Sequence, residues 1–312
     1  MQFQATSIGS AVPQDNFNAT IQSLFDSSLN LRLEHKDRLI TILVSDHYEL
    51  PQGIRVDKKI PLQSLTVGMR AASRGGILRF DSSALAIDLR GAQIWDGRLS
   101  ALTADIQQAW SITWQTLDAG QRLRKTELIA EDLFRSGQGP QLTRRLSQHV
   151  HELLASAERF DSHACAEAAH RIIGLGPGVT PSGDDMLIGF LAGLYSMSGS
   201  QTDRLQFIQA FGNALFLFSK ETNDISRTYI QHAVKGEFSS SIVTLIEAIH
   251  IGEEGRLISV TKNAMQIGHS SGMDSITGLL IGLAAWGVTS FYTNYKEMNY
   301  GNCTTHDQKS LS

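Results

Sequence analysis

The sequence has very little cysteine: Cys165 and Cys303 are the two examples among 312 residues. They lie far apart and in no metal-ligand spacing, which excludes a disulfide framework and a cysteine-based metal site. Such sparse cysteine is typical of proteins that work in a reducing compartment. We therefore expect a cytoplasmic protein.

Excess positive charge and long apolar runs are also missing. The chain has 27 Lys and Arg residues against 31 Asp and Glu residues, and this formal net charge of -4 gives no reason to expect a nucleic-acid partner. The longest apolar runs, 186–195 and 278–288, are interrupted by glycine and fall short of the roughly 20 residues that span a bilayer. The first residues lack the pattern of a signal peptide. We expect no membrane segment.

The first third of the chain has the pattern of β structure. Its short runs of branched or alternating residues are separated by Gly, Pro, Asp and Ser, which favours a small barrel or sandwich over βαβ units. The predicted strands are 38–44, 53–56, 65–71, 76–80 and 84–89.

Helical spacing of apolar residues begins near residue 100 and continues to residue 290. We predict helices within 100–159 and over 162–172, 181–198, 203–219, 222–235, 238–250, 257–266 and 272–290. The expected fold is α+β, with a small β domain over 1–98 packed on a larger, mostly helical domain over 99–292. The polar segment 293–312 is expected to be a disordered tail.

The predicted helical domain contains an internal repeat. The segment SGDDMLIGFLAGL begins at Ser182 and SGMDSITGLLIGL begins at Ser271, and seven of their thirteen positions are identical. The identical positions include Asp185 with Asp274, and glycines spaced four residues apart in both copies. Such glycines mark a close crossing of two helices. If the helices run in the same direction, their N-termini converge and the two aspartates face one pocket about a pseudo-two-fold axis.

The segment GLGPGVTP, residues 174–181, precedes the first repeat helix. Thr180 followed by Pro181 is a typical helix start, and Gly176 and Gly178 allow positive φ angles and exposed amides. A helix N-terminus approached by such a loop binds phosphate or carboxylate. The hydroxyl groups of Thr180 and Ser182 would add donors to this predicted anion site.

Two adjacent aspartates, Asp184 and Asp185, follow in the first helical turn. Carboxylates at this position often only satisfy the helix dipole. Neighbouring residues point about 100° apart on a helix, so the two cannot share one face. Asp185 has the repeat partner Asp274 and is expected to point into the site, whereas Asp184 is expected to be a cap.

Ahead of the second repeat helix, the segment QIGHSSGMD contains His269 and Ser270. A lone histidine is usually structural, but one at a helix start beside serines can bind an anion or act as an acid–base group. The segment 220–236 is interpreted as a well-capped amphipathic helix, with Asn223 kept as a candidate anion ligand.

Three segments, GLGPGVTPSGDDMLIG, TNDIS and GHSSGMDSITG, resemble the signature segments of the AllH-type subunit family, named for a component of oxamate carbamoyltransferase. The resemblance is specific over 174–283 and weaker over the β region. It implies a role, with two other kinds of subunit, in the anaerobic use of allantoin nitrogen during purine catabolism. The implied reaction converts oxalurate and phosphate to oxamate and carbamoyl phosphate.

The residues and the resemblance together give one site hypothesis. Asp185, Asp274 and His269 are the candidate catalytic residues, and Mg²⁺ held by the two aspartates is a candidate cofactor. The candidate ligands for phosphate and a small anionic substrate are Gly176, Gly178, Thr180, Ser182, Gly183, Asn223, Ser270, Ser271 and Gly272. One alternative is a non-catalytic assembly or regulatory subunit with an anion pocket. The other is a Mg²⁺-assisted hydrolase of a small phosphorylated or carboxylated metabolite.

Overall fold

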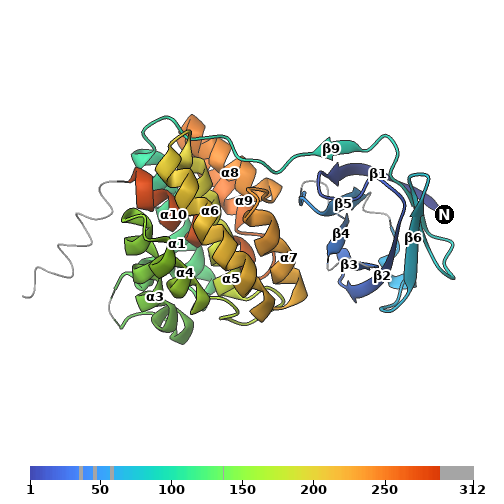
Figure 1. Cartoon of the computed structure of the whole chain (residues 1–312), viewed down its shortest axis with the longest axis horizontal. Helices are drawn as coiled ribbons and strands as arrows, with labels where there is room; N and C mark the ends of the chain where they lie inside the picture. The colour runs from blue at the N-terminus through green and yellow to red at the C-terminus, as the bar shows by residue number, and fades with distance from the viewer. Residues whose placement is uncertain (35–37, 45–47, 57–59, 136, 289–312) are drawn as a thin grey trace, which may run out of the picture. The chain divides into compact units, whose positions relative to one another are not determined.

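A computed structural model describes the chain except for residues 35–37, 45–47, 57–59, 136 and 289–312 (Figure 1). The chain divides into two compact units. The first comprises Met1–Leu99 and Ser219–Thr244, and the second comprises Ser100–Phe218 with the described residues from Leu245 onward. The limits 1–98 and 99–292 stay predictions as limits of independently folding domains, and the predicted tail 293–312 lies outside the described residues.

The first unit is a β-barrel. Its described strands are β1 (Gln2–Gly9), β2 (Phe17–Leu24), β3 (Ser28–Leu33), β4 (Leu39–Val44), β5 (Gly53–Val56), β6 (Arg70–Arg74), β7 (Ile77–Phe80), β8 (Ala86–Asp88) and β9 (Gln93–Trp95). They are hydrogen-bonded in the order β5-β4-β3-β2-β6-β7-β8-β1-β9. Antiparallel pairing of β1 with β5 closes eight strands into a ring, and β9 is an extra strand parallel to β1 (Figure 1). Closure removes the exposed edges that an open sheet would leave. The prediction of a small barrel or sandwich is confirmed, and of these two forms the structure is the barrel.

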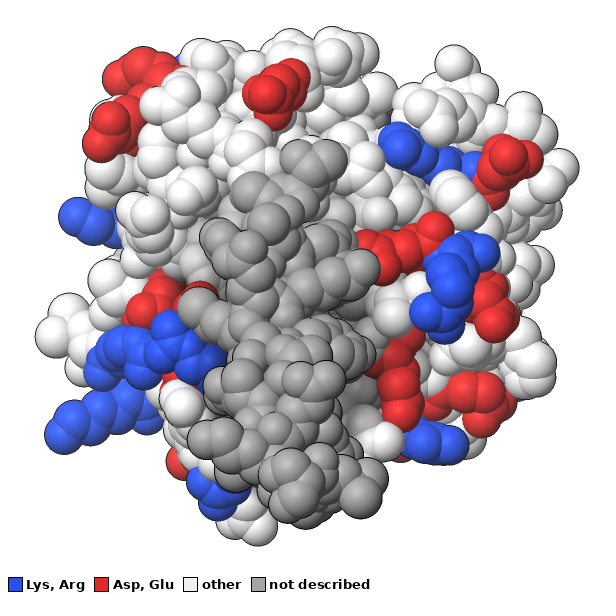
Figure 2. All heavy atoms as spheres, turned by 90° about the vertical axis from the view of Figure 1, so that its left-hand side faces the viewer, with Lys and Arg blue, Asp and Glu red and all other residues white. Residues whose placement is uncertain are grey.

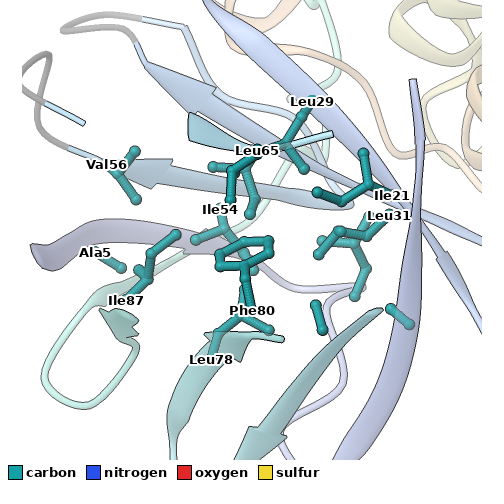
Figure 3. Packing of buried hydrophobic residues seen from close by; sticks show 14 of the residues in the cluster. Ala5, Ile21, Leu29, Leu31, Ile54, Val56, Leu65, Leu78, Phe80 and Ile87 are labelled. Atoms are coloured by element: carbon teal, nitrogen blue, oxygen red, sulfur yellow. The ribbon is translucent and has the colours of Figure 1, made fainter. Parts of the chain in front are cut away.

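Apolar side chains fill the inside of the barrel (Figure 3). Residues on alternate positions of each strand point inward, and Leu29, Leu31, Ile54 and Leu78 are completely buried there. Burying one such side chain contributes about 1.5–3 kcal/mol to stability. The barrel is therefore held by its own apolar core.

The predicted strand over 65–71 is wrong in its position. β6 begins at Arg70, because the residues before it form a turn. Gly68 lies in this turn with a φ of 88° and donates its amide hydrogen to the carbonyl of Ile21 at 2.8 Å. The branched residues that gave the strand pattern therefore precede the strand.

The remaining structure is helical. The helices are α1 (Gln107–Arg124), α2 (Ala130–Leu133), α3 (Gln141–Glu158), α4 (Ser162–His170), α5 (Ser182–Ser198), α6 (Thr202–Phe218), α7 (Asp224–Ala233), α8 (Ser240–Ile251), α9 (Glu254–Ala264) and α10 (Ser271–Gly287), with short 3₁₀ helices at Leu62–Ser64 and Ser219–Glu221. The α+β class is thus confirmed. No helix among the described residues combines the length and the apolar character needed to cross a membrane.

Helix α7 belongs to the barrel unit. The carboxylate of Asp224, its first residue, accepts hydrogen bonds from Gln22 Nε2 at 2.8 Å and from Arg32, and it forms an ion pair with Arg227 at 2.8 Å. Gln22 and Arg32 lie on β2 and β3, so these contacts attach the start of α7 to the barrel wall. The segment TNDIS therefore has a structural role in the first unit.

Helices α5 and α10 form the centre of the second unit, where nearly all of their residues are buried. Helix α1 supports α10 through polar contacts as well as apolar ones. Trp110 donates from Nε1 to the carbonyl of Leu280 at 2.8 Å, and Gln121 donates from Nε2 to Thr277 Oγ1 at 3.1 Å. Buried polar groups paired in this way fix the rotation of a helix that its apolar surface alone would not fix.

Candidate functional site

The two repeat helices, α5 and α10, cross at their glycines. A Cβ atom added to Gly189 would lie 1.9 Å from the carbonyl oxygen of Ser275, and one added to Gly278 would lie 1.8 Å from that of Met186. One turn further along each helix, a Cβ added to Gly193 or to Gly282 would also come within 2.5 Å of a backbone oxygen of the facing helix. Gly189 faces Ser275, and Gly193, further along α5, faces Leu279, which is further along α10. The two helices therefore run in the same direction and are related by a pseudo-two-fold axis.

Each repeat helix is anchored at its start by the loop before it. Gly183 donates its amide hydrogen to the carbonyl of Leu175 at 2.8 Å, and Gly272 donates to that of Ile267 at 3.0 Å. An added Cβ at either glycine would come within about 2 Å of the preceding backbone. Both glycines therefore serve close packing, and a role of their amides in binding a ligand stays a prediction.

The N-termini of α5 and α10 converge on a pair of hydroxyl groups. Thr180 Oγ1 donates to the carboxylate of Asp185 at 2.8 Å and lies 2.8 Å from Ser271 Oγ. Thr180 and Ser271 are both half-buried. The hydroxyl contact joins the two repeats across the pseudo-two-fold axis, and we call the region around it the junction: Thr180, Ser182, Asp185, Ser270, Ser271 and Asp274.

The two repeat aspartates, Asp185 and Asp274, are buried next to the contact between Thr180 and Ser271. Asp185 is 4% exposed and Asp274 is fully buried. Burial raises the pKa of Asp185 well above its usual range, and the negative charge of Asp274 raises it further. Burial raises the pKa of Asp274 to about 6. Because the charge of one carboxyl raises the pKa of the other, the two groups share one buried environment.

Asp274 has no hydrogen-bond partner for either carboxylate oxygen among the described residues. The hydroxyl groups of Ser182 and Ser270 lie near enough to offset part of the rise in its pKa, but neither completes a hydrogen bond. Carboxylates in protein interiors normally accept several hydrogen bonds or pair with a cation. The buried carboxylate of Asp274 therefore departs from this rule.

Asp184 has a different role from its neighbour Asp185. It is fully buried, and its Oδ1 accepts a hydrogen bond from the amide of Gly174 at 2.7 Å. Gly176 and Gly178 follow with φ angles of 115° and 103°, a region that favours glycine. Asp184 therefore fixes the start of the loop through its hydrogen bond with Gly174. Gly178, in the middle of the loop, is exposed.

The other predicted site residues are placed differently. His269 is exposed, and Ser270 is half-buried at the N-cap of α10. Asn223 belongs to the barrel unit, where its side chain accepts hydrogen bonds from the amides of Ile225 and Ser226 at 3.0 and 3.1 Å. The structure therefore brings the hydroxyl groups and the two aspartates together, while anion binding by Asn223 stays a prediction.

Two cavities lie away from the junction. One, of about 650 Å³, is lined by α3 and α4 and includes Arg159 and Arg171. The other, of about 640 Å³, lies in the barrel unit and includes Arg90. The sequence reasoning missed both, because their lining residues are ordinary surface residues without a repeat or motif. On the face drawn in Figure 2, side chains of both charge signs occur close together.

Together these features define an α+β protein with an eight-stranded barrel and a helical unit built on a glycine-crossed repeat. The chain belongs to the AllH family: the model described as oxamate carbamoyltransferase subunit AllH matches residues 172–283, and the AllH family N-terminal domain matches residues 4–94. The first match covers the whole junction. A family described as a subunit implies a carbamoyltransferase of several subunits. No solved structure matches the chain.

Proposed function

We propose that the chain supplies, within a multi-subunit carbamoyltransferase, the site that holds the anionic groups of oxalurate and phosphate while oxamate and carbamoyl phosphate form. The observation that carries this proposal is the convergence of the N-termini of α5 and α10 on Thr180 and Ser271, inside the segment that the family model matches. We include in the proposal a cytoplasmic location and a role in allantoin degradation.

The proposed reaction needs two anion subsites and one proton transfer. An oxygen of hydrogenphosphate attacks the carbamoyl carbon of oxalurate, and the bond from that carbon to the nitrogen of the oxamate moiety breaks. The proton of hydrogenphosphate ends on the oxamate nitrogen, so that charge and atoms balance. Donors aimed at the oxygen that gains negative charge lower the barrier.

The outer groups of the junction suit these tasks best. Ser270 and Ser271 are half-buried hydroxyl donors, and the amides around Gly178 lie in an exposed stretch of the loop. The hydroxyl of half-buried Thr180 donates to Asp185 in the chain without substrate, and its proton rotates toward a bound anion. We assign anion binding to these groups, because the amides of Gly183 and Gly272 already donate to protein carbonyls. His269 is exposed beside the start of α10, and we assign it the proton transfer to the leaving nitrogen.

The test is phosphate-dependent turnover of oxalurate by this chain, alone and with its partner subunits. We expect weak turnover by the chain alone. In the complete complex, Thr180→Val should lower kcat/KM about tenfold or more, the effect of losing one hydrogen bond made in the transition state. Thr103→Val, at an exposed position of the same unit, is the matched control.

The same experiment separates the alternatives. If Thr180→Val and His269→Ala both leave the turnover of the complex unchanged, the chain is an assembly or regulatory subunit. If the chain alone hydrolyses small phosphate esters and the complex does not transfer a carbamoyl group, the hydrolase alternative holds instead.

A further inference from the structure

Among the residues that the structure describes, no positively charged side chain pairs with the buried aspartates of the junction, Asp185 and Asp274. Asp184 lies next to Asp185 in sequence, and its charge contributes to the raised pKa of Asp185. An ionised carboxylate in such a place is strongly unfavourable unless something pairs with it.

The helix starts do not provide this compensation through hydrogen bonds. At the start of α5, the amides of Gly183 and Asp185 donate to backbone carbonyls, and at the start of α10 those of Gly272 and Asp274 do the same. Both oxygens of the Asp274 carboxylate remain without a partner in the described part of the chain. The positive ends of the helices therefore act on the carboxylates only at a distance, which leaves most of the negative charge unpaired.

The donor atoms around the carboxylates are all oxygens. Asp185 and Asp274 stand at equivalent positions of the two repeats. The hydroxyl of Thr180 donates to Asp185, and the hydroxyl groups of Ser182 and Ser270 lie near Asp274. Hard oxygen donors select Mg²⁺, Mn²⁺ or Ca²⁺ over metals that prefer nitrogen or sulfur. Among the described residues, no group of three or more His, Cys, Asp or Glu side chains has metal-binding geometry. A site with only two carboxylates is the kind that Mg²⁺ uses, since Mg²⁺ keeps several waters.

We propose that Asp185 and Asp274 together bind one divalent cation of the Mg²⁺ class, with hydroxyl groups of the junction and water completing its coordination. A small ion is favoured over an organic ligand, because Asp185 is only 4% exposed and Asp274 is fully buried. The cation offsets the two negative charges and lies next to the hydroxyl groups assigned to anion binding. This inference stands independently of the proposed reaction, because it concerns the chain without substrate.

The experiment is a titration of the full-length chain with Mn²⁺, followed by the electron paramagnetic resonance signal of free Mn²⁺. Wild type should bind one Mn²⁺ per chain, and Mg²⁺ should displace it. Asp274→Asn should weaken Mn²⁺ binding at least about tenfold. Asp203→Asn is the matched control, because Asp203 is an exposed aspartate in the first turn of α6, and it should bind Mn²⁺ as wild type does.

Several outcomes would overturn the proposal. These are no Mn²⁺ binding by wild type, equal binding by Asp274→Asn, or displacement by Ca²⁺ but not by Mg²⁺. Circular dichroism establishes that each variant is folded. If Asp274→Asn does not fold, Mn²⁺ binding is measured with Asp185→Asn instead. An unchanged Mn²⁺ affinity in that variant would contradict the proposal. Turnover is not measured, so this result and the test of carbamoyl transfer can fail separately.

Discussion

Gly189 on α5 and Gly278 on α10 are counterparts: each faces the backbone of the other's helix at a distance that leaves no room for a side chain. Gly278→Ala should therefore force the helices apart and destabilise the second unit by about 3 kcal/mol. Urea unfolding measures the change. The control is Gly255→Ala on α9, where an added Cβ meets only the flexible end of Glu253. There the better helix propensity of alanine should stabilise by about 0.5–1 kcal/mol. Equal effects at both positions would contradict the crossing.

A second prediction concerns the charge of Asp274 in the presence of a chelator. Its pKa is raised from the usual 3.8 to about 6, so the folded state holds this proton more tightly than the unfolded state. The resulting stabilisation is fully present below the unfolded pKa and is lost as the pH rises through about 6, to a total of about 2–3 kcal/mol. Asp274→Asn should remove this loss and make the protein more stable than wild type above that pH.

Urea unfolding in EDTA at several pH values between about 4 and 8 checks this prediction. The difference between Asp274→Asn and wild type should be small in acid and grow toward neutral pH. Asp203→Asn should follow wild type throughout. A constant difference across the pH range would mean that the Asp274 carboxyl is not held as the structure indicates.

The loop before α5 provides a third prediction. Gly178 has a φ of 103°, and an added Cβ would make only an ordinary van der Waals contact, 3.7 Å from the carbonyl oxygen of Thr180. Gly178→Val therefore meets backbone strain of about 1–3 kcal/mol without a clash. We expect the loop to change conformation and phosphate binding to fall below detection in calorimetric titration, while the unfolding midpoint changes little. Gly91→Val carries the same kind of strain at an open position of the barrel unit and should leave phosphate binding intact. Equal phosphate affinity in wild type and Gly178→Val would show the loop to be a structural cap.

The fourth prediction separates the TNDIS segment from the junction. Asp224→Ala removes the acceptor shared by Gln22, Arg32 and Arg227. The ion pairs are partly exposed, so the loss should be modest, about 1–2 kcal/mol. Differential scanning calorimetry should register it, while Mn²⁺ and phosphate affinities stay at the wild-type values. Loss of either affinity would assign Asp224 to a ligand site.

Local pattern predicted the fold class but not the barrel's closure. The strands β4, β5, β7 and β8 were predicted because branched residues dominate them. β1 and β2 were missed, because polar residues such as Gln4 and Gln22 alternate with small inward residues such as Ala5 and Ala19. The pairing of β1 with β5 joins segments far apart in the chain, and no local spacing encodes such a register.

The junction was more predictable than the barrel, because the repeat itself carries the symmetry. Identical positions such as Asp185 and Asp274 must occupy equivalent places once two like helices cross. The sequence could not indicate that the amide of Gly183 is already bonded, since this depends on how closely the carbonyl of Leu175 approaches. Nor could the sequence indicate that neither Asp274 carboxylate oxygen accepts a hydrogen bond from a described residue, since this depends on side-chain geometry.

The two loops that lead into the crossed helices differ, and this has a consequence for anything bound above the aspartates. The loop from Leu175 to Gly183 is longer and carries Gly178, whereas the shorter one from Ile267 to Gly272 carries His269. The glycine crossing is therefore symmetric, while the two loops that lead into it are not. If the proposed site holds a molecule with unlike ends, each end would face a different loop, and the molecule would have one preferred orientation.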